Sequence, residues 1–136
     1  MQPRTCEFGF PGPLRDRLVA AVLAEEKTAT TSLLAEWEHE NEALPTVGEE
    51  QTVIDSACKP TATIEITACA VTELAAVDDT VALAEGEDYK TAAAWRTEHE
   101  RFWREEVLPQ WDGGTPPVID DSTLVVVQWF HVKTRL

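Results

Sequence analysis

Hydrophobic residues recur along the chain with two periods, one near 3.6 that is typical of amphipathic helices and one of two that is typical of strands. Four segments carry the helical signal: residues 13–24, 33–40, 79–84 and 90–106. Four carry the strand signal: residues 27–32, 51–55, 61–71 and 124–132. The intervening segments, among them residues 41–48, 56–60 and 109–117, are rich in turn-forming residues and are predicted as loops and turns.

Two of the predicted strands have distinct patterns. Residues 61–71 alternate, with Ile64, Ile66, Ala68 and Ala70 expected on one face and Thr63, Glu65, Thr67 and Cys69 on the other. Residues 124–132 are apolar on both faces over much of their length, which predicts a strand at the centre of the sheet.

The helical segments carry start signals, with Pro13 suited to the first turn of the first helix and Asp78 to the cap of the third. In residues 90–106, Glu100 and Arg104 form a favourable pair four residues apart. Strands and helices are mixed without a regular strand–helix–strand repeat. The sequence therefore predicts an α+β fold, a small mixed β-barrel or sheet flanked by helices, in one domain over residues 1–136.

The composition is globular and strongly acidic. The 136 residues are 43% hydrophobic and include 6 Gly and 8 Pro, enough apolar material for a sizeable core. The formal net charge is −14, which argues against tight non-specific binding to a phosphate backbone, because such binding needs clustered Lys and Arg. A DNA duplex is therefore not an expected partner.

The cysteines and the apolar runs bear on location. Cys6, Cys58 and Cys69 have no paired spacing, and an odd count of this kind suggests reduced thiols. No basic-then-apolar signal segment follows Met1, and no run approaches the ~20 apolar residues of a membrane span. We expect a cytoplasmic protein that does not associate with membranes.

The stretch from Lys27 to Ser32 holds the densest candidate chemistry. It places one ammonium and four hydroxyls in six residues, directly after an apolar helix and the pair Glu25-Glu26. Its threonines favour extended backbone, so the helix is expected to end near Ala24 and a strand to begin at Lys27. Such a junction can line a pocket, although a threonine-rich strand with a solvated lysine is the commoner origin of this pattern.

Several motifs together resemble the ASCH-domain family, which has a PUA-like fold, and most closely its small stand-alone bacterial members. They are Phe8-Gly-Phe-Pro-Gly-Pro13, Glu26-Lys-Thr-Ala-Thr30, Leu44-Pro-Thr-Val-Gly48, Ile64-Glu-Ile-Thr67, Glu85-Gly-Glu-Asp88, and Trp95-Arg followed by His99-Glu-Arg-Phe-Trp103. Each is weak alone, but their order and spacing extend over nearly the whole chain. The resemblance implies a PUA-like β-barrel with helices beside a cleft.

The resemblance also implies a ligand class. The family is linked to RNA-related ligands, some members deacylate N4-acetylcytidine as amidohydrolases, and others are reported to bind or cleave RNA. In the amidohydrolase branch a lysine, a threonine three residues later and a distant glutamate carry the chemistry. These map onto Lys27, Thr30 and Glu87, with Glu85 as the second choice for the acid. The implied partner is a small nucleoside-like ligand or single-stranded RNA.

Two departures from the family pattern concern the same stretch. Glu25 stands where the family usually has glycine, which would permit a left-handed helix end. Thr31 and Ser32 follow where the amidohydrolase branch would supply a basic residue. The substrate can therefore differ even if the pocket is kept.

Two protonation schemes fit these residues. In one, burial lowers the pKa of Lys27 so that its neutral amine activates Thr30, and Glu87 handles the proton of the leaving amine. In the other, Lys27 stays charged and stabilises an oxyanion, while Glu87 is the base for water or Thr30. Because Lys27 and Thr30 would face opposite ways on a straight strand, both schemes need Lys27 in the turn before it.

Further candidates lie beside these motifs. Thr28, Ser32, Trp37, Glu85 and Tyr89 are expected to contact the ligand. Trp95 and Trp103 could stack on a base, but helical spacing favours the core for both, with His99 packed and hydrogen-bonded on the same side of the helix.

No metal site or cofactor is predicted. His39 and His99 each sit in a Glu-His-Glu triplet without the local spacing of metal ligands. The acids Glu85, Glu87 and Asp88 could hold a hard cation, but acidic clusters in loops are usually solvated.

The sequence thus supports one main hypothesis and two alternatives. The main hypothesis is a cleft for a pyrimidine nucleoside or an RNA-derived base, with hydrolysis of an N4-acyl amide as the candidate reaction. The alternatives are a non-catalytic RNA-binding or RNA-cleaving module and a partner-binding domain with a vestigial pocket. A continuous basic track beside the cleft would favour RNA, and an acidic rim would favour a small neutral ligand. A cleft filled by side chains would favour the partner-binding domain.

Overall fold

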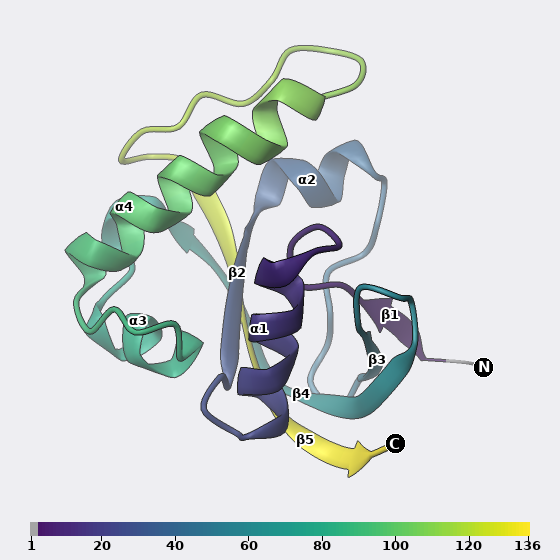
Figure 1. The fold of residues 1–136 in the computed structure, drawn as a ribbon. Coiled ribbons are helices and arrows are strands. Elements are labelled where there is room, and N and C mark those ends of the chain that lie inside the picture. The colour runs from purple at the N-terminus through teal and green to yellow at the C-terminus, as the bar shows by residue number, and fades with distance from the viewer. Residues whose placement is uncertain (1–2) are drawn as a thin grey trace.

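The computed structural model describes residues 3–136 and contains a mixed, curled sheet with helices on both of its faces (Figure 1). Its five strands are β1 (Arg4–Cys6), β2 (Ala29–Leu33), β3 (Glu50–Ile54), β4 (Pro60–Glu73) and β5 (Leu124–Arg135), in the order β1-β3-β4-β5-β2. Strands β1 and β3 are parallel, and the other neighbours are antiparallel. The sheet forms a half-barrel, in agreement with the α+β fold predicted from the sequence, and β5 lies inside it, as its two apolar faces predict.

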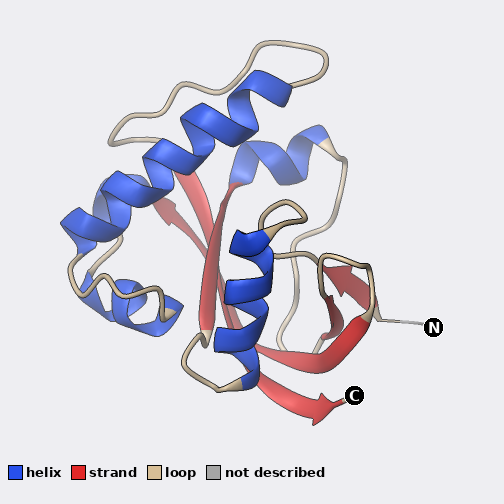
Figure 2. Ribbon diagram, in the orientation of Figure 1, coloured by secondary structure: helices blue, strands red, loops and turns tan. Residues whose placement is uncertain are grey.

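The helices are α1 (Pro13–Leu23), α2 (Leu34–His39), α3 (Asp79–Glu85) and α4 (Ala92–Phe102), with short helical turns η1 (Leu74–Ala76), η2 (Trp103–Val107) and η3 (Leu108–Gln110). Figure 2 shows α1 in front of the strands, with α3 and α4 to one side. Helix α4 continues as the π-helical turn η2 and the 3-10 turn η3, which contains Pro109. In the described part of the chain, residues 3–136, no helix combines the length and the apolar character of a membrane span.

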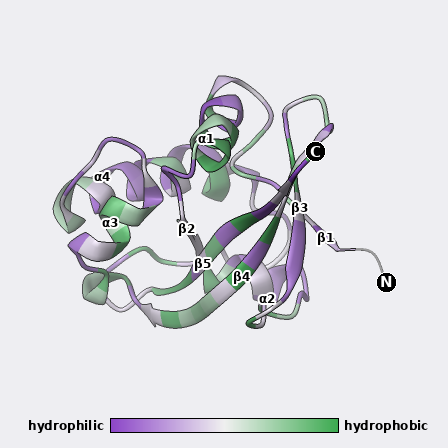
Figure 3. Ribbon diagram, turned by 90° about the horizontal axis from the view of Figure 1, so that it is seen from below, coloured by the Kyte–Doolittle hydropathy of each residue, from purple (hydrophilic) through white to green (hydrophobic). Residues whose placement is uncertain are grey.

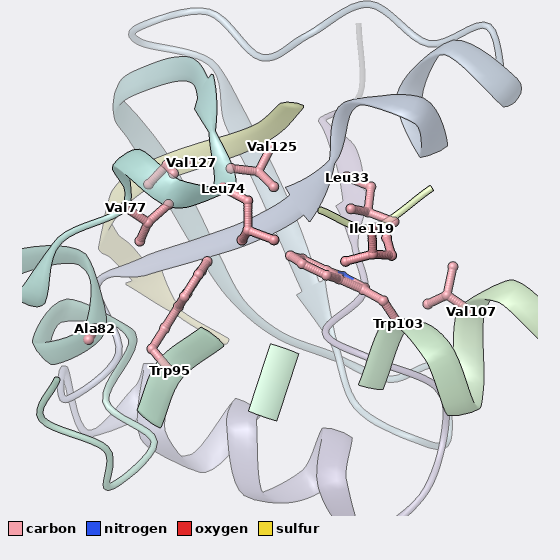
Figure 4. Packing of buried hydrophobic residues seen from close by; sticks show 10 residues of the cluster. All are labelled: Leu33, Leu74, Val77, Ala82, Trp95, Trp103, Val107, Ile119, Val125 and Val127. Carbon is pink, nitrogen blue, oxygen red and sulfur yellow. The ribbon is translucent and has the colours of Figure 1, made fainter. Parts of the chain in front are cut away.

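Two hydrophobic cores hold the layers together. The α1 core joins α1 to the inner face of the sheet through Phe8, Leu18, Val19, Val22, Val53, Ile64, Ile66 and Phe130. The α4 core covers the other face and comprises Leu33, Leu74, Val77, Ala82, Trp95, Trp103, Val107, Ile119, Val125 and Val127 (Figure 4). Trp95 and Trp103 are 0% and 2% exposed, which confirms their predicted core role. Burying an indole removes on the order of 200 Å² from water, worth about 5 kcal/mol.

Strand β4 departs from the predicted alternation. Ile64 and Ile66 face the α1 core as expected, but the register with β5 shifts between Ile66 and Ala68. Beyond this bulge the sides are exchanged, so that Cys69 packs against the α1 core while Ala68 and Ala70 are exposed. The prediction for these three residues is wrong because one extra residue in a strand reverses the faces that follow. Figure 3 shows hydrophobic and hydrophilic stretches interspersed along β4 and β5.

Other differences from the prediction lie at element ends. Strand β1 and turn η1 were not predicted, because three-residue elements carry too little periodicity.

The Asp78 cap is confirmed, since its carboxylate accepts hydrogen bonds from the backbone of Thr80 and Val81. The pair Glu100–Arg104 is also confirmed, at 2.9 Å.

The end of α1 decides where Lys27 lies. Glu25 adopts the left-handed conformation, with φ of 60°, which favours glycine. The amides of Glu26 and Lys27 both donate to the carbonyl of Ala21, at 2.9 and 3.1 Å, and so close the helix. Lys27 therefore belongs to the turn, and β2 begins at Ala29 instead of at Lys27 as predicted.

Substitution of Glu25 by glycine should raise the free energy of unfolding by about 1 kcal/mol. A left-handed conformation costs a residue with a Cβ roughly 1–2 kcal/mol, and part of this gain is lost to the greater freedom of glycine in the unfolded chain. Urea denaturation measures the change. Glu26→Gly is the control and should lower the free energy of unfolding, because φ at Glu26 is not positive. A loss of stability in Glu25→Gly would contradict the strain argument.

Candidate functional site

The candidate site forms where the turn after α1 meets the end of α3, two segments about 60 residues apart in the chain. The amide of Thr28 donates to the carbonyl of Ala84 at 2.7 Å. At Gly86, which ends α3 with φ of 66°, an added Cβ would lie 2.2 Å from the carbonyl oxygen of Glu26. Only glycine allows this approach, so Gly86 lets the two segments meet and places Lys27 beside Glu85.

Lys27 and Glu85 form a buried ion pair. The side chains are 1% and 0% exposed, and Nζ of Lys27 lies 3.3 Å from Oε1 of Glu85. The ammonium also donates to the backbone carbonyl of Glu85 at 3.3 Å and to Oε2 of Glu87 at 3.1 Å. All three hydrogens of the lysine thus have acceptors, as burial of a charge requires.

Glu85 is the hub of the site, since both of its oxygens have two partners. Oε1 faces Lys27 and Nε2 of His99, the latter at 3.2 Å. Oε2 accepts from the hydroxyl of Thr31 at 2.6 Å and from the indole of Trp95 at 2.7 Å. Glu85 is thereby fixed in place and has little capacity left for a ligand.

Glu87 is less engaged. Oε2 accepts from Lys27 and, at 2.9 Å, from the hydroxyl of Tyr89. Within residues 3–136, Oε1 of Glu87 has no hydrogen-bond partner, and its side chain is 20% exposed. Glu87 therefore presents a free carboxylate oxygen to incoming molecules, which Glu85 does not.

The pKa values in the cluster follow from burial opposed by opposite charges. Burial alone would raise the pKa of Glu85, but the charges of Lys27 and His99 and the bonds from His99 and Thr31 lower it from 4.5 to about 2. Burial alone would lower the pKa of Lys27, yet Glu85 and Glu87 outweigh it and raise that pKa. Burial and the neighbouring carboxylates also raise the pKa of Tyr89. Lysine is thus a cation and tyrosine neutral at ordinary pH.

His99 completes the cluster from the side of α4. Its Nδ1 lies 3.0 Å from the carbonyl of Trp95, which can only accept, and its Nε2 faces the ionised Glu85. His99 thereby connects the backbone of α4 to the buried carboxylate of Glu85. The ring stacks on Trp95 at 4.2 Å, which confirms the packed, hydrogen-bonded histidine predicted from the sequence.

The same groups contain a set of metal-ligand types. Single ligand atoms of Glu85, Glu87 and His99 lie within 4.8 Å of one another. The ammonium of Lys27, however, already bonds both carboxylates. A metal ion would have to displace this cation, so the residues do not fit a metal site in this state.

A cavity of about 1360 Å³ opens beside the cluster, between the loop before α1, the edge strand β2 and α4. Most predicted site residues line it: Lys27, Thr30, Ser32, Trp37, Glu85, Glu87 and Tyr89. Thr28 does not line the cavity, and its hydroxyl instead donates to the carbonyl of Ala84 in α3. Lys27 and Thr30 share the cavity because Lys27 precedes the strand, which meets the geometric condition set by their odd spacing.

The motif Phe8–Pro13 builds one wall of the cavity. The Phe8 ring lies 5.7 Å from Nζ of Lys27, and Phe10 stacks on Phe102 of α4 at 5.9 Å. Buried Arg15 of α1 fixes this loop, because its guanidinium donates hydrogen bonds to the carbonyls of Phe8 and Gly9. This segment therefore joins α1 to α4 across the mouth of the cavity.

Comparison with known proteins identifies the family. An ASCH-domain model matches residues 4–134. The chain belongs to the ASCH-domain family. A crystal structure of protein EF3133 from Enterococcus faecalis V583 is 31% identical, with a TM-score of 0.84, and the match covers 99% of this chain and 78% of that one. An ASCH domain from Lactobacillus crispatus JV V101 is 27% identical, with a TM-score of 0.78, covering 95% and 78%. No curated protein matches the chain.

Several residues of this ASCH domain that face the site were not predicted from the sequence. Thr31, and not only Thr30, reaches the cluster, and His99 belongs to it. Gln51 and Gln128 line the cavity and are 4% and 7% exposed. The sequence contained a signal for Gln128, because this polar residue interrupts the apolar run of β5.

Substitution of Gly86 by alanine should lower the free energy of unfolding of this ASCH domain by about 2–4 kcal/mol. The positive φ costs about 1 kcal/mol, and the clash with Glu26 adds about 1–3 kcal/mol of overpacking. Gly113→Ala is the matched control, because Gly113 has φ of 77° with nothing within 4 Å of the added Cβ. Chemical denaturation of both variants tests this; equal losses would contradict the close-approach argument.

The stability of the ASCH domain should fall as the pH is lowered from 4.5 toward 2. The folded pKa of Glu85 lies below its unfolded value, so the carboxylate stabilises the fold above pH 4.5 and this contribution disappears on protonation. The shift corresponds to about 3 kcal/mol. Urea denaturation of the wild type and Glu85→Gln across this range measures it. Glu85→Gln should be less stable at pH 7 and show a shallower decline, whereas an equally steep decline would contradict the assignment.

Proposed function

We propose that the cavity of this ASCH domain binds a pyrimidine nucleoside or a closely related free base and hydrolyses an acyl amide on its N4 nitrogen. One observation carries the proposal: Lys27, Thr30 and Glu87 line the same cavity, with Lys27 and Glu87 joined at 3.1 Å. These residues have the types and the spacing that the amidohydrolase branch of the family uses.

The charge state of the cluster favours the second of the two protonation schemes. Lys27 is a buried cation held by two carboxylates, so it does not serve as a neutral base for Thr30. Within residues 3–136, Oε1 of Glu87 has no hydrogen-bond partner, and Glu87 lines the cavity, so this carboxylate can accept a proton there. The geometry thus supports Glu87, and not Glu85, as the acid–base residue.

The proposed reaction begins with attack on the acyl carbonyl carbon by water or by the hydroxyl of Thr30. Glu87 takes the proton of the attacking oxygen and delivers it to N4 as the carbon–nitrogen bond breaks. Lys27 stabilises the oxyanion by its charge, and a direct hydrogen bond requires exchange of one of its 3.3 Å contacts. After attack by Thr30, a water molecule hydrolyses the ester and releases the carboxylic acid.

The charge of the cavity lining supports a small uncharged ligand over RNA. The lining contains eleven Asp and Glu residues against four Lys and Arg residues, Arg4, Arg17, Lys27 and Arg101. Lys27 is already neutralised within the buried cluster. A polyanionic backbone would be repelled by such a rim, whereas a nucleoside carries no phosphate.

Aromatic residues offer places for a ring to stack or to be held at its edge. Trp37 donates its indole N–H to the hydroxyl of Ser32 at 2.8 Å, and Tyr89 bonds Glu87. Both hydrogen bonds fix the aromatic ring at the cavity wall. Arg4 lies over the Trp37 ring at 5.6 Å, so one face of that indole is already covered.

The decisive assay is incubation with N4-acetylcytidine, with cytidine release followed by chromatography. Glu87→Gln should lower kcat/KM at least about 100-fold, because general acid–base catalysis typically contributes this much or more. Thr30→Val should lower it by a similar factor where Thr30 is the nucleophile and little where water attacks directly. Lys27→Ala should abolish turnover, with circular dichroism to verify its fold.

Matched controls are available outside the cavity. Thr97 is an exposed threonine of α4, and Lys59 is an exposed lysine of the β3–β4 turn; Thr97→Val and Lys59→Ala should leave turnover unchanged. Absence of cytidine release by the wild type at high enzyme concentration would exclude this substrate. Salt-dependent binding of RNA oligonucleotides would then favour the RNA-binding alternative.

A further inference from the structure

Gln128 is a polar residue in an unusual position. It lies on the central strand β5, between Thr30 of β2 and Cys69 of β4 in the register. Its neighbours Val125, Val126, Val127 and Phe130 are all buried and apolar. Gln128 is 7% exposed and points to the inner face of the sheet, where it lines the cavity.

The carboxamide of Gln128 makes no hydrogen bond to any group of residues 3–136. Among residues 3–136, Nη1 of Arg15 is the fully enclosed side-chain polar atom that lacks a hydrogen-bond partner. The amide atoms of Gln128 also lack partners but are not fully enclosed, so they reach the open space of the cavity. An amide that faces open space adds little to the packing of its apolar neighbours, and its donors and acceptor stay available to a molecule in the cavity. The position is therefore suited to pairing with something in the cavity.

A carboxamide has a particular recognition geometry. It offers one acceptor and one donor side by side, which match an adjacent donor and acceptor on the edge of a nucleobase, as in the pairing of Gln with adenine. Cytosine presents such an edge at N4–H and N3, and N4-acylation leaves one N4–H in place. The register sets Thr30 directly beside Gln128, so a base held by its edge would bring the N4 substituent near that hydroxyl.

We propose that Gln128 is a specificity-determining residue that holds a nucleobase by the adjacent donor and acceptor of its edge. This inference rests on the proposed nucleoside-binding function and adds to it the residue that selects the base. Gln51, the other buried glutamine of the cavity, is less suited to this task because its amide nitrogen already donates to Glu49 at 2.8 Å.

The experiment compares two probes, cytidine and pyrimidin-2-one ribonucleoside, which differ only in the 4-amino group. NMR titration gives the dissociation constant of each for the wild type and for Gln128→Met, which has a similar size and no amide. The wild type should prefer cytidine by at least about fivefold, the range for one good bidentate pair. Gln128→Met should bind cytidine more weakly and lose the preference.

The controls separate this inference from the proposed hydrolysis. Gln110→Met, an exposed glutamine of η3, should keep the preference, and Gln128→Leu is a second variant should Gln128→Met fail to fold. A preference retained by Gln128→Met, or absent from the wild type, overturns the role of Gln128. If the wild type nevertheless releases cytidine from N4-acetylcytidine, only the role of Gln128 is overturned and the hydrolase proposal stands. Failure to bind either probe or to hydrolyse overturns both.

Discussion

The buried ion pair between Lys27 and Glu85 is the interaction on which the rest of the site depends. Two charges at 1% and 0% exposure carry a large desolvation penalty, which their attraction offsets only when every remaining donor and acceptor is satisfied. Thr31, Trp95 and His99 supply those partners from β2 and α4. Two apolar residues would join the same segments at a lower electrostatic cost, so we infer that the charges serve the cavity that they border.

The acidity of the chain has a local meaning at this cavity. A net charge of −14 describes the whole molecule, and in the cluster the buried ammonium of Lys27 lies between the carboxylates of Glu85 and Glu87. The remaining acids form the rim. This arrangement places a buried ion pair beside the cavity and acidic groups around it, which disfavours a polyanion.

Much of the fold was predictable because helices and strands leave periodic signals that depend on near neighbours alone. The apolar faces of α1 and α4, the Asp78 cap and the central position of β5 all follow from such patterns. The errors arise where a distant contact decides the outcome. The bulge in β4 is set by its pairing with β5. The amides of Lys27 and Thr28 donate to the carbonyls of Ala21 and Ala84 instead of to a strand partner.

The sequence by itself determined which residue types that can do chemistry are present, and the resemblance to the ASCH-domain family selected Lys27, Thr30 and Glu87 as the candidates. Tertiary structure decided which of them are free to act. Glu85 and Glu87 are two residues apart and chemically identical, but one has four partners and the other retains an open oxygen. That difference depends on Thr31, Trp95 and His99, which reach Glu85 only when β2, α3 and α4 pack together, and no local pattern encodes it.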